Sequence, residues 1–126
     1  MNTISTKKFI INLIGINTIH IIFNDDVIID YEEIKRIKDS LDDFETRKYL
    51  IVDISQISGM DIGAIELASK DDTIFKDKVV AIVGDEHSIS SKYMNLIKSQ
   101  YQYDNLFLFY SFQDAENFFK SKKEGQ

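Results

Sequence analysis

The sequence predicts one α/β domain built around a mixed β-sheet, and three observations lead to this prediction. Short apolar runs rich in Ile and Val alternate with longer segments of helical periodicity, which is typical of parallel strands joined by helices. The first two apolar runs are separated only by Gly15-Ile16-Asn17, which indicates an antiparallel hairpin. The chain has 126 residues, of which 44% are hydrophobic, and this suits a single domain with one core.

The first half of the chain predicts a hairpin followed by a well-capped helix. Residues 7–14 and 18–23 form the two strands, and residues 27–29 add a short extended segment. Asp30 can cap the helix that follows, and Glu33 stands at the position that completes a capping box. The residues of this helix that recur at helical spacing, and that we expect to be buried, are Ile34, Ile37, Leu41 and Phe44.

The remaining strands are predicted from near-continuous apolar runs. Residues 49–54 and 78–83 favour strands that are covered on both faces, and residues 106–110 form the last strand. The resulting order is β-β-α-β-α-β-α-β-α, with about five strands and four helices. We expect the single domain, residues 1–126, to have its core at about 7–121 and a frayed tail at 122–126.

Three further helices follow from spacing and capping residues. Residues 61–70 have helical spacing, and Ser88 or Ser90 can cap a helix that ends near Tyr101. Ser111 with Asp114 indicates the start of the last helix. The inner faces of the last two helices are expected to carry Tyr93, Met94, Ile97, Ala115, Phe118 and Phe119.

Composition excludes several classes of protein. The net charge of −6 disfavours binding to nucleic acid, because acidic chains repel phosphate backbones. The absence of Cys excludes disulfides and suits a reducing compartment, so a cytoplasmic location is expected. Only two His are present, and we expect neither a metal site nor a cofactor. No apolar run approaches the 18 or so residues that a bilayer crossing needs, so membrane insertion is not expected.

The segment from Asp53 to Ile65 resembles the signature of STAS domains. That family includes bacterial anti-sigma-factor antagonists and the cytoplasmic tails of sulfate transporters. The positions that match its pattern are Asp53, Ser55, Ile57, Met60, Asp61 and Ile65. The resemblance implies a STAS-like fold over roughly residues 7–121. The part from residue 79 to residue 115 is also similar to less characterised bacterial STAS-like or Sec14-like small proteins.

Two positions of the motif depart from the family pattern. Ile62 stands where the family has its phosphoacceptor Ser, and Ala64 replaces the Gly that follows. In the antagonists, an anti-sigma factor that is also a kinase phosphorylates this Ser and thereby releases itself. Ile62 has no hydroxyl, so the resemblance implies a binding module without this switch.

The residue types in this segment are consistent with a partner-binding surface at the start of a helix. Asp61 can cap that helix, and the preceding loop lies at the carboxyl end of a parallel strand, where open α/β sheets place their ligands. An exposed Ile62 would suit contact with a protein. The candidate partner-binding residues are Ser58, Gly59, Asp61, Ile62 and Glu66. A protein partner of unknown identity is expected, and a homodimer is also open.

A second polar loop, containing Asp85, His87 and Ser88, is a weaker candidate for ligand binding. An acid, a His and a hydroxyl in one loop suggest a minimal hydrolase using His87, but adjacent residues rarely converge as a triad. The other alternative is a carrier of a lipid or small apolar ligand, held between the last helices and the sheet. We favour the binding module, and we expect no enzymatic activity.

Overall fold

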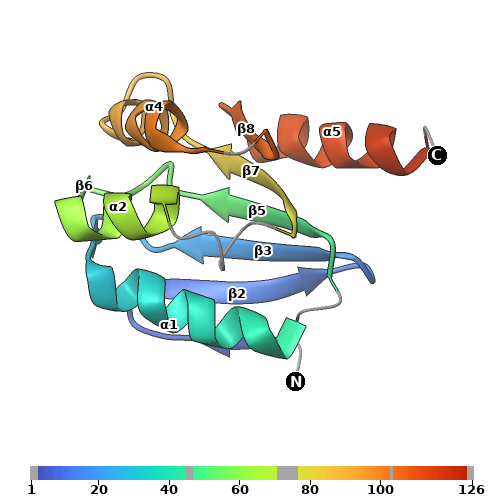
Figure 1. Cartoon of the computed structure of the whole chain (residues 1–126), viewed down its shortest axis with the longest axis horizontal. Coiled ribbons are helices and arrows are strands. Elements are labelled where there is room, and N and C mark those ends of the chain that lie inside the picture. The colour runs from blue at the N-terminus through green and yellow to red at the C-terminus, as the bar shows by residue number, and fades with distance from the viewer. Residues whose placement is uncertain (1–2, 45–46, 71–76, 103, 125–126) are drawn as a thin grey trace.

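The computed structural model describes residues 3–44, 47–70, 77–102 and 104–124 (Figure 1). It confirms the mixed α/β fold, with a six-stranded sheet in the order β1-β2-β3-β5-β7-β8 and a two-stranded sheet, β4-β6. The strands are β1 (Thr3–Ser5), β2 (Phe9–Ile14), β3 (Thr18–Phe23), β4 (Ile28–Ile29), β5 (Tyr49–Asp53), β6 (Gly59–Met60), β7 (Val79–Val83) and β8 (Leu106–Phe109). The helices are α1 (Tyr31–Leu41), the 3-10 turn η1 (Asp42–Phe44), α2 (Ile62–Lys70), α4 (Ser90–Gln100) and α5 (Phe112–Glu124).

The sheet combines antiparallel and parallel pairings as the sequence predicts. β2 and β3 form the hairpin, and Gly15 takes a φ of 62° in its turn, a conformation that glycine adopts without strain. β3, β5, β7 and β8 run parallel to one another. The edge strand β1 was not predicted, because a three-residue strand with Ile4 as its single apolar residue carries no detectable period.

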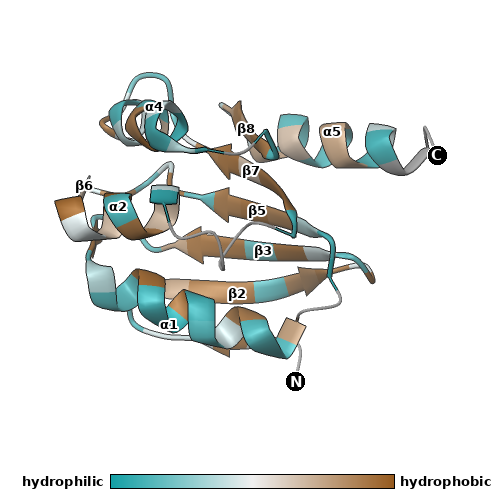
Figure 2. Ribbon diagram, in the orientation of Figure 1, coloured by the Kyte–Doolittle hydropathy of each residue, from teal (hydrophilic) through white to brown (hydrophobic). Residues whose placement is uncertain are grey.

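Helices cover both faces of the sheet (Figure 1). The β5 strand shows the division, since Leu50 belongs to the larger core while Tyr49 and Ile51 belong to a second cluster on the opposite face. The larger core includes residues of α1, α2 and α4, whereas Ala115 and Phe119 of α5 pack in the second cluster. Figure 2 shows that the strands of the sheet are largely hydrophobic.

Most of the predicted helix starts are confirmed. Asp30 and Glu33 form the complete capping box of α1, and the hydroxyl of Ser111 accepts the amide of Asp114 at 3.1 Å. The prediction that Ser88 or Ser90 is the N-cap of α4 was wrong, because the N-cap is Ile89 and has no side-chain cap. Ser90 is instead the first helical residue, and its hydroxyl accepts the amide of Asp85 at 2.9 Å.

The C-terminal helix is longer than predicted. α5 continues to Glu124, so residues 122–124 are helical rather than frayed, and residues 125–126 lie outside the described residues. Lys122 has a reason to remain ordered, because its ammonium lies 5.1 Å from the ring centre of Phe118 and 5.5 Å from that of Phe107. None of the described helices combines the length and hydrophobicity needed to cross a bilayer.

Gly84, directly after β7, is required by close packing against α4. A Cβ atom at this position would overlap the sulfur of Met94, which is fully buried, and would lie 3.3 Å from the hydroxyl of Ser90. Any side chain here therefore forces Met94 out of its place in the core.

We predict that Gly84→Ala lowers the free energy of unfolding by about 1–3 kcal/mol, the usual cost of overpacking a core. Urea unfolding followed by circular dichroism measures the change. Gly63→Ala is the matched control, since a Cβ there meets its nearest atom at 3.5 Å. Equal stability of Gly84→Ala and the wild type would contradict this account of the β7–α4 contact.

His20 of β3 lies under the start of α5. Its ring centre is 4.6 Å from that of Phe112, and its Nε2 atom is buried without a hydrogen-bond partner in the described part of the chain. Burial lowers the pKa of His20 below its ordinary value of 6.5, more than the negative charges of Asp53 and Glu116 raise it. The folded chain is therefore more stable when His20 is neutral than when it is protonated.

This stabilisation is complete above the ordinary pKa of 6.5 and is lost as the pH falls below it, because the unfolded chain then binds more protons. We predict that His20→Phe reduces the loss of stability on acidification through this range. Urea midpoints measured on both sides of pH 6.5 test the prediction. His87→Gln, whose side chain is 87% exposed in the wild type, is the control and should keep the wild-type slope.

Candidate functional site

Two segments that are distant in sequence meet at the predicted partner-binding loop. β4 pairs with β6 in parallel, with Ile28 opposite Gly59 and Ile29 opposite Met60. Backbone hydrogen bonds continue the pairing on both sides, from the Asp26 amide to the Gln56 carbonyl at 3.0 Å and from the Asp61 amide to the Ile29 carbonyl at 2.9 Å. The loop is therefore held along its length by residues 26–29.

The start of α2 follows directly from this pairing. A carboxylate oxygen of Asp61 accepts the amide of Ala64 at 2.8 Å, so Asp61 caps the helix as predicted. The apolar positions of the motif, Ile57, Met60 and Ile65, point into the core. Ile62 points the other way and is 74% exposed, so the core does not require an apolar side chain at this position.

The structure places two further exposed apolar residues beside the predicted set. Six large hydrophobic residues are exposed in the described part of the chain, and three of them, Ile28, Tyr31 and Ile62, lie here. Their neighbours are glycines, since a Cβ on Gly59 would lie 3.8 Å from Ile28 and one on Gly63 would lie 3.5 Å from Tyr31. We call the surface formed by Ile28, Tyr31, Ser58, Gly59, Asp61, Ile62 and Glu66 the β6–α2 surface.

The predicted partner-binding residues differ in their exposure. Ser58, Asp61, Ile62 and Glu66 are exposed, whereas Gly59 is buried beneath Ile28 and the hydroxyl of Tyr93. Gly59 therefore shapes the surface by leaving room for its neighbours. Ile28 and Tyr31 were missed, although the contrast between exposed Ile28 and buried Ile29 is the alternation expected of a strand with one solvent face.

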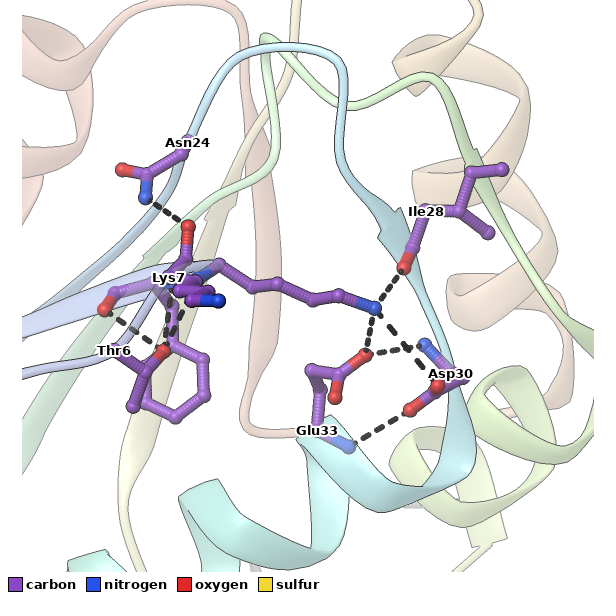
Figure 3. Close-up of polar contacts among 8 residues, drawn as sticks. Thr6, Lys7, Asn24, Ile28, Asp30 and Glu33 are labelled. Atoms are coloured by element: carbon purple, nitrogen blue, oxygen red, sulfur yellow. Dashed lines mark hydrogen bonds and ion pairs between the residues drawn. The ribbon is translucent and has the colours of Figure 1, made fainter.

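A polar cluster holds β4 and the start of α1 to the hairpin (Figure 3). The ammonium of Lys8 donates to a carboxylate oxygen of Glu33 at 2.9 Å and to the carbonyl of Ile28 at 3.4 Å, and it lies 3.9 Å from a carboxylate oxygen of Asp30. The hydrogen bond to Glu33 raises the pKa of Lys8 above its ordinary 10.5. Lys8 and Glu33 thus fix the backbone from which Ile28 and Tyr31 project.

The second candidate loop does not assemble the groups of a hydrolase. Asp85 accepts the backbone amide of His87 at 2.9 Å, and the Ser88 hydroxyl lies 2.6 Å from that of Ser90. The imidazole of His87 is directed to Glu86, with its Nε2 3.5 Å from a carboxylate oxygen. Asp85 and Ser88 are therefore occupied in shaping the turn before α4, while the His87 side chain extends into solvent.

Cavities bear on the alternative of an apolar-ligand carrier. Between α5 and the sheet, the structure has a pocket of about 220 Å³ lined by Ile14, Gly15, Thr18, Ile51, Glu116, Phe119 and Lys120. A hollow inside the larger core measures only about 30 Å³. Both volumes lie below the roughly 300–1,000 Å³ of typical small-molecule sites. Among the described residues, no group of three or more His, Asp or Glu is placed to hold a metal ion.

The fold is similar to that of an anti-sigma factor antagonist. The chain is similar to the solved structure of the anti-sigma factor antagonist SpoIIAA in its unphosphorylated form, with a TM-score of 0.59 and 10% identity over 90% of this chain and 97% of that chain. No family model matches the sequence, and no curated protein matches it. The structural likeness confirms the STAS-like fold that the motif from Asp53 to Ile65 predicts, and it establishes the fold alone.

The polar cluster at Lys8 generates a prediction about the framework of this site. We predict that Glu33→Ala lowers the free energy of unfolding by about 1–2 kcal/mol, because it removes half of a capping box and the partner of Lys8. Chemical denaturation measures the loss. Glu32→Ala is the matched control, since Glu32 is an exposed acid in the same first turn. If both variants lose the same stability, the general effect of an acid at the helix start, and not the cluster, accounts for the change.

Proposed function

We propose that this chain is a non-catalytic regulatory module that acts in the cytoplasm and binds a protein partner through the β6–α2 surface. The observation that carries the proposal is the grouping of three exposed apolar side chains, Ile28 at 59%, Tyr31 at 44% and Ile62 at 74% exposure. Large apolar residues that gather on a surface and are rimmed by polar ones mark interaction sites. Here the polar rim consists of Ser58, Asp61 and Glu66.

The framework beneath the surface supports binding by a prearranged site. The β4–β6 pairing, the Asp61 cap and the Lys8–Glu33 ion pair hold the backbone on both sides of the apolar residues. A surface that is already ordered loses little conformational entropy on association. Tyr, here Tyr31, is one of the residue types that contribute most binding energy at protein interfaces.

The partner is proposed to bind without the phosphorylation switch of the STAS family that the motif resembles. The similar protein SpoIIAA was described in an unphosphorylated form. The motif resemblance assigns the phosphoacceptor position to Ile62 in this chain, and Ile has no hydroxyl to accept a phosphoryl group. Binding at this surface is therefore constitutive or is regulated at another position.

Non-catalytic action is proposed from the arrangement of the polar loop. The Ser88 hydroxyl and the His87 imidazole have different partners, and a nucleophile needs a base within hydrogen-bond reach. A second copy of the chain is an alternative occupant of the β6–α2 surface. Sedimentation equilibrium of the purified protein distinguishes a homodimer from a module that binds a different protein.

We predict that Ile62→Asp weakens partner binding by about 2 kcal/mol or more, the cost of losing a central contact residue. The change should spare the fold, because Ile62 is exposed and an acid is favourable in the first turn of a helix. Affinity capture from a lysate, followed by titration with the identified partner, measures the effect.

The matched control is Ile16→Asp, which makes the same substitution at an equally exposed Ile in the hairpin turn. It should capture the same partner as the wild type, with unchanged affinity. If Ile62→Asp retains the wild-type partners and affinities, the β6–α2 surface is not the binding site. If the wild type captures no protein while native mass spectrometry reveals a co-purified lipid, the module is a carrier instead.

A further inference from the structure

An open groove lies beside Ile62, between the start of α1 and the exposed face of α2. It has a volume of about 360 Å³ and is lined by Tyr31, Gly63, Glu66, Leu67 and Lys70. Figure 1 shows the start of α1 close to α2. The groove is continuous with the β6–α2 surface, because Tyr31 and Glu66 belong to both.

Gly63 lines the groove, and the fold does not require a glycine at this position. It is a helical residue, and a Cβ there would lie 3.5 Å from Tyr31 and 3.6 Å from Asp61, which are ordinary contacts. Alanine therefore fits, and it would lose less backbone entropy on folding than glycine does. The missing side chain leaves a notch between Tyr31 and Leu67 that a larger residue would fill.

The charges around the notch are unevenly distributed. Asp61, just before α2, and Glu66, in the middle of α2, are exposed acids, and Glu32 is an exposed acid next to Tyr31. Lys70, at the end of α2, is the basic residue among those that line the groove. A Cβ on Gly63 would lie 3.6 Å from a carboxylate oxygen of Asp61, so the part of the groove near Gly63 is acidic, in a chain whose net charge is −6.

We propose that this notch receives one apolar side chain, the size of Leu or Met, from a segment of the protein partner, with a Lys or Arg beside it that pairs with Glu66. The proposal rests on the proposed function, since it names the partner chemistry of the same surface. Charge complementarity selects a basic protein segment. An anionic membrane is disfavoured by the acidic rim, and an open groove cannot enclose a free small molecule as typical pockets do.

A displayed library of random peptides, selected on the wild-type protein, provides the probe. The selected sequences are expected to share an apolar residue next to Lys or Arg, and one synthetic consensus peptide is then titrated by fluorescence anisotropy. Gly63→Leu, which fills the notch, should weaken binding about tenfold or more. Gly63→Ala is a smaller change that should weaken binding less while it leaves the urea midpoint equal or higher.

A charge exchange tests the pairing at Glu66. Glu66→Lys should lower the affinity for the consensus peptide. A second peptide, with Glu in place of the basic residue, should bind the Glu66→Lys variant more tightly than it binds the wild type. A merely structural effect of the substitution would not reverse the preference in this way. Ile16→Asp is the control and should bind the consensus peptide as the wild type does.

The results of these titrations distinguish a failure of the notch proposal from a failure of the proposed binding surface. A consensus peptide that loses affinity for Ile62→Asp but not for Gly63→Leu would overturn the notch and leave the proposed function standing. A peptide whose affinity changes with neither variant would count against both. A library that yields no enriched sequence, or an enriched sequence without the apolar and basic pair, would also overturn the notch.

Discussion

The parallel backbone pairing of residues 26–29 with residues 56–61 is the interaction on which the rest of the β6–α2 surface depends. It brings Ile28, which follows the hairpin, next to the loop that precedes Ile62. The main-chain hydrogen bonds on both sides of β4 and β6 fix the positions of the first residues of α1 and α2 relative to each other. They therefore place Tyr31 next to Gly63. The short pairing therefore makes one surface from two parts of the chain.

The overall fold could be predicted from the sequence because its signals are local. The alternation of apolar runs with helical spacing identified the strands of the hairpin, β5, β7 and β8, and the pair Asp30 and Glu33 identified the start of α1. The edge strand β1 and the two-residue strand β6 escaped prediction, because elements of this length have no period. The predicted extended segment at residues 27–29 contains β4, but its pairing with β6 was not predicted.

The candidate site could be predicted only as far as one segment extends. Ser58, Gly59, Asp61 and Ile62 are close in sequence, so a motif reveals them together. Ile28 and Tyr31 join them through tertiary pairing, which no local pattern encodes. Closeness in sequence is also a poor guide at His87, Asp85 and Ser88. These three residues are near one another in the chain, but the His87 side chain points toward Glu86 and does not meet the other two.

The exposure of Ile62 separates two kinds of position in the motif, with a consequence for how the chain can change over evolution. Ile57, Met60 and Ile65 are constrained by the core, so related sequences should keep them apolar. Position 62 contributes nothing to that core, and under the proposed function its residue is free to change with the partner. Among relatives, variation at this position should therefore correlate with changes in the bound protein, even where the scaffold is unchanged.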